Sequence, residues 1–340
     1  MTNQALVEIK ELSKYFPLGT SLFRKEKKVV RAVDGVSFSI GRGEVLALVG
    51  ESGSGKTTIA RLVLGLTRPT SGTVEFRGRN IFDLSDKELL GLRKHMQLVA
   101  QDSASAFNPR KTIRHILAQP LKIHEHYSND QINDMISKLL VRVGLNPPEQ
   151  FLSRFPHELS GGQRQRIGIA RAISLNPEFI VADEPVSALD VSVRSQILNV
   201  FKLIQRTNEL SVLFITHDLS VVRSVCHKIA VMYAGKIVEH ATVEKLFNSP
   251  AHPYTQALLA ATPIPDPAIA QKKKKMALTG DVPSLIDLPK GCRYQARCPW
   301  KEEICETVEP ELTQYESDHL VACHVASRSS VKEMQALHRS

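Results

Sequence analysis

The first 250 residues alternate between short apolar runs and longer stretches with apolar residues at helical spacing. The runs Val45–Val49, Phe179–Ala182 and Val212–Ile215 are each wholly apolar and are followed by glycine or polar residues. Apolar runs of this length that helices separate are typical of buried, largely parallel strands. The pattern therefore predicts an α/β domain.

Two further patterns interrupt this alternation. The expected strands Val7–Ile9, Val36–Ile40 and Val74–Phe76 alternate with polar residues or lie close together, which predicts an antiparallel β subdomain. From about residue 100 to residue 175, apolar residues recur at helical spacing, and Gly144 follows as the residue after a helix end. This part is predicted to be a helical subdomain with its apolar stripe in the core. The stripe consists of Ile132, Met135, Ile136, Leu139, Leu140 and Val143.

The composition changes after about residue 250, where prolines become frequent. Residues 262–283 include the lysine run Lys272–Lys275 and are predicted to form an exposed linker. The lysines are expected to keep this linker soluble, and contact with lipid headgroups is the alternative. The predicted division is a domain over residues 1–255, a cysteine-containing C-terminal region over residues 256–330 and a tail over residues 331–340.

Length and charge narrow the classes of protein. The chain has 340 residues, with 44 Lys and Arg against 35 Asp and Glu, so its formal net charge is +9. This balance excludes an acidic disordered protein and allows anionic partners, such as nucleotides, nucleic acids or lipid headgroups. No apolar run reaches the roughly 18 residues that a membrane span requires, and the first residues lack the pattern of a signal peptide. The protein is therefore expected to stay in the cytoplasm and to reach a membrane only through a partner.

A phosphate-binding motif follows the first of the apolar runs. Residues Gly50–Thr57 match G-x-x-x-x-G-K-[ST] and precede the predicted helix Thr58–Leu64. The glycines let backbone N–H groups surround a phosphate, and the helix N-terminus adds positive potential. Lys56 is expected to reach the β- and γ-phosphates, and the Thr57 hydroxyl to bind Mg²⁺. The residues expected to bind nucleotide here are Gly50, Ser52, Gly53, Gly55, Lys56, Thr57 and Thr58.

Two adjacent carboxylates follow the apolar run Phe179–Ala182. Asp183 stands where a strand end beside the phosphate loop can hold Mg²⁺ through water. Glu184 can orient and polarise an attacking water molecule. Adjacent carboxylates are common on protein surfaces, but their position directly after a buried strand favours a functional role.

The pentapeptide Leu159–Gln163 reads Leu-Ser-Gly-Gly-Gln. Locally it predicts a helix start, with Ser160 as N-cap and Gln163 completing a capping box. Because it lies between the phosphate loop and Asp183, it also resembles the signature of ATP-binding-cassette (ABC) ATPases.

Other motifs of that family occur in the same order along the chain. Gln101 corresponds to the Q-loop glutamine, Ser187–Asp190 to the D-loop and His217 to the switch histidine. Phe16 corresponds to the aromatic residue that stacks on adenine. The family usually has Phe-Gln-Asp-Pro at the Q-loop, whereas this chain has Ala-Gln-Asp-Ser over residues 100–103.

The resemblance implies a fold and a set of residue roles. The fold is the ABC ATPase cassette, with a mostly parallel core sheet, an antiparallel β subdomain and a helical subdomain, followed here by a small cysteine-containing extension. The implied activity is ATP hydrolysis, with Glu184, His217 and Lys56 as catalytic residues. Mg²⁺ would be held by Thr57, Gln101 and Asp183. Further nucleotide contacts would come from Ser160, Gly161, Gly162, Gln163 and Asp190, those of the signature loop being made across a head-to-tail dimer.

Over its whole length the chain resembles ATP-binding subunits of dipeptide and oligopeptide importers, and the insertion Gly19–Val30 is similar to that of the second ATPase of such importers. This implies several partners: a second homologous ATP-binding subunit, two transmembrane permease subunits and, indirectly, an extracytoplasmic solute-binding protein, but no nucleic acid. The implied location is the cytoplasmic face of the cell membrane. The segments that carry the resemblance are Arg31–Phe38, Asn108–Arg110, Phe155–Leu159, Ser249–Thr255 and Gly291–His324.

Four cysteines lie close together in the C-terminal region: Cys292, Cys298, Cys305 and Cys323. Four thiolates suffice for a [4Fe–4S] cluster or for tetrahedral zinc, but no C-x₂₋₄-C pair of the kind usual in structural zinc sites occurs. Their spacing alone leaves cluster, zinc and unligated thiols open. Some peptide-importer ATPases with a similar tail bind an iron–sulfur cluster, and this resemblance favours the cluster, with zinc as the alternative. Cys226 is expected in the core.

Competing functions remain for a cassette of this kind. Importers of nickel, sugars or opines share these motifs. The net charge of +9 suggests a cassette protein that acts on nucleic acid, but the long heptad insertion of such proteins is missing. Cassette proteins that act on ribosomes normally carry two cassettes, and this chain has one set of motifs. The favoured function is therefore an ATPase subunit of a peptide importer.

Overall fold

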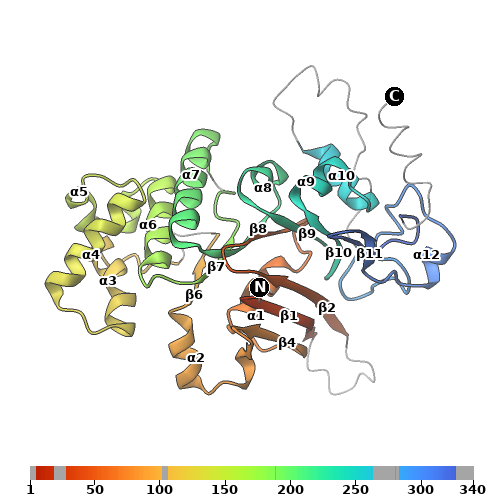
Figure 1. Ribbon diagram of the computed structural model, residues 1–340, viewed down its shortest axis with the longest axis horizontal. Helices are drawn as coiled ribbons and strands as arrows, with labels where there is room; N and C mark the ends of the chain where they lie inside the picture. Colours follow the sequence, from red (N-terminus) through yellow and green to blue (C-terminus); the bar gives the residue numbers. More distant parts are fainter. Residues whose placement is uncertain are drawn as a thin grey trace.

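The computed structural model describes residues 5–18, 28–101, 106–187, 189–262, 280 and 283–326. Two sheets and several groups of helices build the molecule (Figure 1). The larger sheet has eight strands in the order β11-β12-β10-β9-β3-β8-β7-β6, and the smaller has four in the order β2-β1-β4-β5. The predicted linker over residues 262–283, the lysine run and the tail over residues 331–340 fall almost wholly outside the described residues, as does most of the insertion Gly19–Val30.

Five neighbouring parallel strands make up the part of the larger sheet that ends at β6. They are short, and four of them, β3, β7, β8 and β9, consist mostly of buried apolar residues because both faces of the sheet are covered. Alternate residues face two different cores: Val45 packs with the helical side, and Leu46 packs with the side of the small sheet. The predicted strands are confirmed. The five are β3 (Val45–Val49), β6 (Met96–Val99), β7 (Phe179–Asp183), β8 (Ser211–Thr216) and β9 (Lys228–Tyr233).

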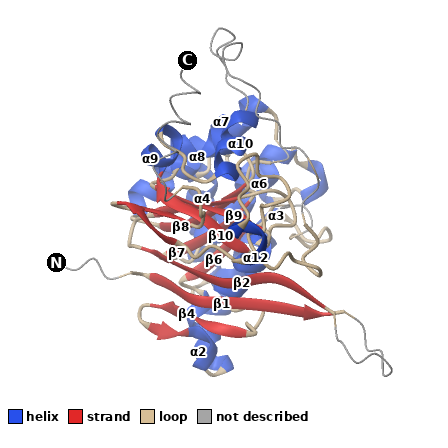
Figure 2. Ribbon diagram, turned by 90° about the vertical axis from the view of Figure 1, so that its right-hand side faces the viewer, coloured by secondary structure: helices blue, strands red, loops and turns tan. Residues whose placement is uncertain are grey.

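The small sheet is antiparallel, as predicted. Val7 of its central strand pairs with Ile40 on one side and with Phe76 on the other. The apolar residues of this sheet and of helix α1 (Lys56–Val63) share one core with the main sheet. Figure 2 shows β1, β2 and β4 of the small sheet lying along one side of the main sheet. The strands are β1 (Val7–Pro17), β2 (Val29–Ile40), β4 (Ser71–Phe76) and β5 (Arg79–Asn80); η1 (Ile81–Asp83) and α2 (Asp86–Arg93) follow before β6.

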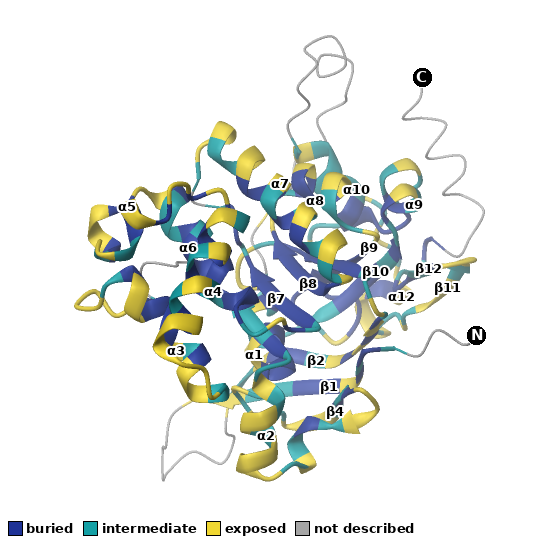
Figure 3. Ribbon diagram, turned by 60° about the vertical axis from the view of Figure 1, so that its left-hand side comes forward, coloured by how far each residue is buried: buried dark blue, intermediate teal, exposed yellow. Residues whose placement is uncertain are grey.

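A group of helices lies between β6 and β7, which confirms the predicted helical subdomain. The predicted stripe faces its core: Ile132, Ile136, Leu140 and Val143 are buried, and the outer faces are exposed (Figure 3). Gly144 has φ +72° just beyond the end of its helix, a conformation that glycine adopts at low cost. The elements are α3 (Ile113–His124), α4 (Asn129–Arg142), α5 (Glu149–Leu152), η2 (Pro156–Glu158) and α6 (Gly161–Ile173).

The C-terminal region continues the main sheet. Strand β12 pairs antiparallel with β10, with Glu239 opposite Val321. Glu239 is fully buried and accepts hydrogen bonds from the backbone N–H groups of Ala251 and His252, while His319 Nε2 lies 2.7 Å from its Oε1. These contacts attach the C-terminal region to the preceding part of the chain. The remaining elements are α7 (Val191–Asn208), α8 (Leu219–Val225), β10 (Lys236–Thr242), α9 (Val243–Asn248), α10 (Pro253–Ala261), α12 (Ile304–Thr307), β11 (Thr313–Glu316) and β12 (His319–Val321).

None of the helices in the described part of the chain combines the length and the apolar composition needed to cross a membrane. The predicted domain limits at residues 255 and 330 stay predictions.

Candidate nucleotide-binding site

The phosphate loop connects β3 to α1, as the motif predicts. Two of its glycines lie where no side chain fits. A Cβ atom on Gly50 would come within 2.2 Å of the Met232 carbonyl oxygen, and one on Gly55, which has φ +109°, within 2.2 Å of the Ala32 carbonyl oxygen. The loop is therefore held against β2 and the end of β9. Ser52 and Gly53 are exposed at its tip, where a ligand can reach them.

Lys56 points back into this loop. Its side chain is buried, and Nζ donates hydrogen bonds to the carbonyl oxygens of Gly50 and Glu51, both at 2.8 Å. Burial lowers the pKa of Lys56, and the nearby carboxylates of Glu184 and Asp183 oppose this effect. An ammonium group at the centre of a glycine-rich loop, with carboxylates across from it, is suited to bind phosphate oxygens.

Asp183 ends strand β7 on the same side of the sheet. Burial raises its pKa, and a hydrogen bond with the Thr57 side chain opposes the rise. Its Oδ1 atom is buried and has no hydrogen-bond partner within the described residues. A buried carboxylate oxygen without a partner, next to a hydroxyl, is a fitting donor pair for Mg²⁺. The structure thus brings Thr57 and Asp183 together, and their role as magnesium ligands stays a prediction.

Glu184 joins two residues from other parts of the chain. Gln101, just after β6, donates from Nε2 to Glu184 Oε2 at 3.1 Å. His217, just after β8, has Nδ1 at 3.1 Å from Glu184 Oε1. The carboxyl ends of β6, β7 and β8 bring these three side chains together, because the strands are parallel neighbours. The three predicted residues form one cluster beside the phosphate loop.

The two aromatic residues at the end of β1 have different surroundings. The hydroxyl of Tyr15 donates to Asp34 Oδ1 at 2.5 Å, whereas Phe16 is 41% exposed with Lys14 Nζ 5.1 Å from its ring centre. Of these two rings, that of Phe16 is the one available to stack on a planar ligand.

The signature segment begins α6, and its local structure is confirmed. The Ser160 side chain accepts from the backbone N–H of Gln163, whose side chain accepts from the Ser160 N–H. A Cβ atom on Gly162 would come within 2.4 Å of Val193, so α6 packs closely against α7. Ser160 and Gly161 are exposed, as is Asp190, the N-cap residue of α7. These exposed residues lie on the helical side of the molecule. Ala188 of the D-loop lies outside the described residues.

A further group of residues lies around the phosphate loop, and no sequence pattern predicts it. Arg297 forms a paired contact with Glu51, and the Tyr254 hydroxyl accepts from the Glu51 N–H. Glu51 and Arg297 are 246 positions apart, so no local spacing could have indicated their contact.

Comparisons with known proteins define the class first. Residues 33–187 match the ABC transporter family. A dimeric structure of the ATP-binding cassette MJ0796, in a post-hydrolysis state bound to ADP and phosphate, has a TM-score of 0.62 and 29% sequence identity, covering 70% of this chain and 98% of that one. The fold is therefore the ABC ATPase cassette, as predicted.

The C-terminal region narrows the class, since residues 238–305 match the C-terminal region of oligopeptide and dipeptide transporters. The oligopeptide transport ATP-binding protein AppF of Bacillus subtilis is 46% identical over 325 residues, 95% of this chain and 98% of that protein. The protein OppF of Salmonella typhimurium, with the same description, is 42% identical over 323 residues, 94% of this chain and 96% of that protein. The chain belongs to this family of peptide-transport ATP-binding proteins.

The prediction of an iron–sulfur cluster, with zinc as its alternative, is wrong. Cys292 and Cys305 are buried in an apolar core, and burial raises the pKa of Cys292 to about 12 and that of Cys298 to about 11. Burial also raises the pKa of Cys323. Cluster and zinc ligands are thiolates, which this environment disfavours. Throughout the described ranges no group of three or more His, Cys, Asp or Glu side chains is placed to hold a metal ion, and the matched families are described as transporter ATP-binding proteins.

Cys226 packs against the apolar core, as predicted, and burial raises its pKa.

Proposed function

We propose that this chain hydrolyses ATP to drive the import of peptides, as one of two ATP-binding subunits attached to two transmembrane permease subunits. The observation that carries the proposal is the meeting of Lys56, the Thr57–Asp183 pair and the Glu184 cluster at one edge of the parallel sheet. Family membership supports the same conclusion.

Phosphate binding is assigned to the loop and to Lys56. The Lys56 ammonium is bound by carbonyl oxygens of its own loop. The β- and γ-phosphates of ATP are stronger acceptors, so they would take over this group while N–H groups of Gly53, Gly55 and the first turn of α1, including Thr58, point at them. Phe16 would stack on the adenine, consistent with its exposed ring.

The cation is assigned to Thr57 and Asp183, with Gln101 at the edge of the site. Bound there, Mg²⁺ would neutralise charge on the β- and γ-phosphates. The unpartnered Oδ1 of Asp183 supports this assignment. A cation bound there would give the buried Oδ1 atom of Asp183 a partner.

Water activation is assigned to Glu184. Its carboxylate already bonds to Gln101 and His217, which fix its orientation. Glu184 would accept a proton from the attacking water, while Lys56 and His217 stabilise the charge on the transferred phosphoryl group. Gln101 links this cluster to the segment before the helical subdomain.

The second ATP-binding subunit is needed to complete the site. Ser160, Gly161, Gly162 and Gln163 begin a helix whose N-terminus is partly exposed, and such an end favours an anion. In a head-to-tail dimer each subunit would present this end, with Asp190 nearby, to the γ-phosphate held by the other. Closing of that interface on ATP and its opening after hydrolysis would move the permease.

The relatives' names support peptides as the solute, in preference to nickel, sugars, opines or nucleic acid. We place the chain at the cytoplasmic face of the membrane, where an extracytoplasmic solute-binding protein delivers peptide from the other side. The test is to purify the chain together with candidate permease subunits and a second ATPase, and to measure ATP hydrolysis with and without a peptide-loaded binding protein. Peptide-stimulated hydrolysis supports the proposal. Stimulation by loaded nickel- or sugar-binding proteins alone contradicts it.

A further inference from the structure

The C-terminal region contacts the phosphate loop through one buried arginine. Arg297 Nη1 and Nη2 donate to Glu51 Oε2 and Oε1 at 3.0 and 3.1 Å, which makes the pair bidentate. The Arg297 side chain is 4% exposed and lies against the rings of Tyr233 and Tyr294, with distances of 5.8 and 5.9 Å to the ring centres. A bidentate arginine packed on aromatic rings has little freedom, so it fixes the carboxylate that it holds.

Glu51 is the second residue of the phosphate loop, and all of its polar groups are engaged. Its N–H donates to the hydroxyl of Tyr254 at 2.9 Å, and its carbonyl oxygen accepts from Lys56 at 2.8 Å. Tyr254 is fully buried in α10. The position of the loop, and with it the starting position of Lys56, is therefore set by two side chains, Arg297 of the C-terminal region and Tyr254 just before that region.

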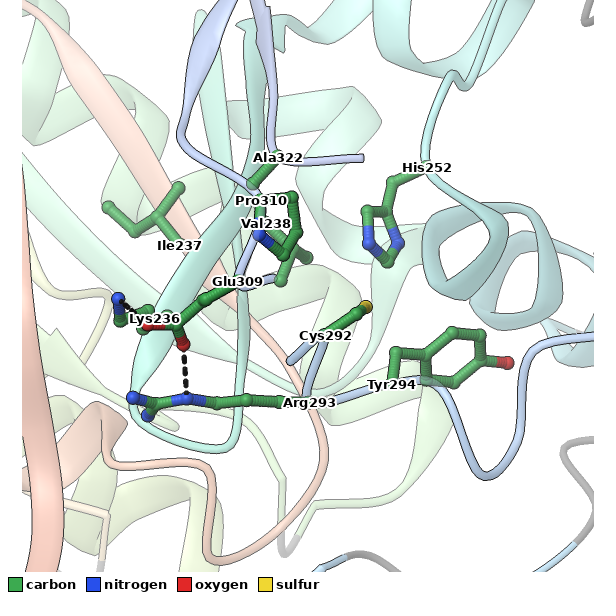
Figure 4. Close-up of a pocket in the computed structure, with 10 residues that line it drawn as sticks. All are labelled: Lys236, Ile237, Val238, His252, Cys292, Arg293, Tyr294, Glu309, Pro310 and Ala322. Carbon is green, nitrogen blue, oxygen red and sulfur yellow. Dashed lines mark hydrogen bonds and ion pairs between the residues drawn. The ribbon is translucent and has the colours of Figure 1, made fainter. Parts of the chain in front are cut away.

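A second arginine, four positions earlier, is connected to the part of the nucleotide site that contains Phe16. Arg293 bonds to Asp34 on β2, to the carbonyl oxygen of Ala234 at 2.6 Å and to Glu309 at 2.9 Å. Figure 4 shows Arg293 and Lys236 both reaching Glu309, beside a cavity of about 20 Å³. Asp34 in turn accepts from Tyr15, the neighbour of Phe16.

Asp34 is held as an anion in this contact. Burial by itself would raise its pKa, but the hydrogen bonds from Tyr15 and Arg293 lower it below the ordinary value. The turn after β9 connects the two arginine contacts: the Asp34 N–H donates to the Gly235 carbonyl, and the Gly235 N–H donates to the carbonyl of Ser54 in the phosphate loop.

We propose that Arg297 and Arg293 are positioning residues of the nucleotide site, through which the C-terminal region sets the affinity of the cassette for ATP. Arg297 acts on the phosphate loop through Glu51, and Arg293 acts on the Phe16 strand through Asp34 and Tyr15. The inference rests on the proposed function, since it takes ATP as the ligand. It assigns to the C-terminal region a role in nucleotide binding besides its attachment to the sheet.

The negative charge of Glu51 allows the role of Arg297 to be tested directly. Glu51 places a carboxylate in the loop that receives the phosphates, and Arg297 neutralises it. Without Arg297 that carboxylate would repel ATP, and a repulsion of this kind in a partly exposed site corresponds to about a tenfold loss of affinity. Removing the carboxylate as well, in the double variant Arg297→Ala/Glu51→Gln, should restore most of the loss, which a purely structural role of Arg297 would not produce.

The experiment measures the dissociation constant of a fluorescent ATP analogue for the full chain, and then KM and kcat of ATP hydrolysis in the assembled complex. For Arg297→Ala we expect about tenfold weaker binding and a correspondingly higher KM, with kcat changed less than threefold. The double variant should bind within about threefold of the wild type. Arg297→Lys, which keeps the charge but loses the bidentate geometry, should lie between. Arg142→Ala removes a half-buried arginine that bonds to Asn208 in another part of the molecule, and it should leave binding unchanged.

Unchanged binding in both Arg297→Ala and Arg297→Lys would overturn the inference. So would a loss that the double variant does not restore, because it would mean that Arg297 supports only the fold. Arg297→Lys keeps the test open if Arg297→Ala does not fold. These outcomes are separate from the proposed function: wild-type chain that binds the ATP analogue but shows no peptide-stimulated hydrolysis would contradict the proposed transport role and leave this inference intact.

Discussion

Replacing Glu184 with glutamine tests the chemical role of its carboxylate alone. The substitution keeps the size of the side chain, and the amide can still bond to Gln101 and His217 across the 3.1 Å contacts that Glu184 makes. What it removes is the basic oxygen that accepts a proton from water. ATP binding should therefore persist while hydrolysis becomes slow.

The expected size follows from the role assigned to the carboxylate. A positioned general base contributes about 10² to 10⁴ in rate, which corresponds to roughly 3–5 kcal/mol of activation free energy. Loss of the negative charge also removes one of the carboxylates that attract the Lys56 ammonium, so ATP affinity should stay equal or rise slightly. Slow hydrolysis with intact binding predicts that a closed, ATP-bound dimer accumulates.

The assay is phosphate release by the assembled complex at saturating ATP, together with size-exclusion chromatography in ATP to detect the dimer. Glu178→Gln is the control, because this carboxylate lies just before β7, at the opposite end of the strand from Glu184, where it pairs with Arg42 and Arg77. The control should keep hydrolysis within about twofold, since these ion pairs lie away from the phosphate loop. Turnover of Glu184→Gln within tenfold of the wild type would refute the assignment of Glu184 as the base.

Three further predictions test other parts of the site. Lys56→Ala should weaken ATP binding by at least about tenfold, measured by calorimetry, because phosphate loses its buried cation; unchanged affinity would contradict the phosphate-loop assignment. Asp183→Asn should abolish Mg²⁺-dependent hydrolysis yet raise the unfolding midpoint of the nucleotide-free chain by about 2 °C, and a lower midpoint would show that the burial of Asp183 costs nothing. The midpoint should rise because burial raises the folded-state pKa of Asp183. As pH rises through that pKa the protonated form is lost, and at neutral pH the buried ionised form lowers the stability of the folded chain. Phe16→Ala should raise KM for ATP about tenfold, whereas the same substitution leaving KM unchanged would mean that another group holds the adenine.

Much of the cassette was predictable because its signals are local. β3, β7 and β8 are wholly buried, and a strand covered on both faces has a continuous apolar run, which only its end residues interrupt here. The phosphate loop and the start of α6 are fixed by residues within eight positions of each other, so their geometry follows from glycine placement and capping chemistry.

The C-terminal region was less predictable because its structure depends on distant partners. Pairing of β12 with β10, and the contacts of Arg293 and Arg297 with Asp34 and Glu51, join segments that share no local pattern. The sequence around an arginine does not indicate which distant carboxylate it pairs with in the folded chain.

The cysteines show a different limit of sequence reasoning. Spacing gives the number of sulfur atoms within reach of one another, but not the burial that decides between thiol and thiolate. Cys292 and Cys305 pack among Tyr233, Tyr254 and Tyr294, and this apolar setting could not be inferred from the intervals between the cysteines.

The central claim is that ATP hydrolysis by this chain drives peptide import, and uptake of a labelled peptide tests it most directly. Liposomes would contain the permease subunits, the second ATPase and this chain, with peptide and binding protein on one side of the membrane and Mg²⁺-ATP on the other. We expect uptake that requires ATP and is lost when Glu184→Gln replaces the wild-type chain. Peptide uptake that continues with this variant, or without ATP, would contradict it.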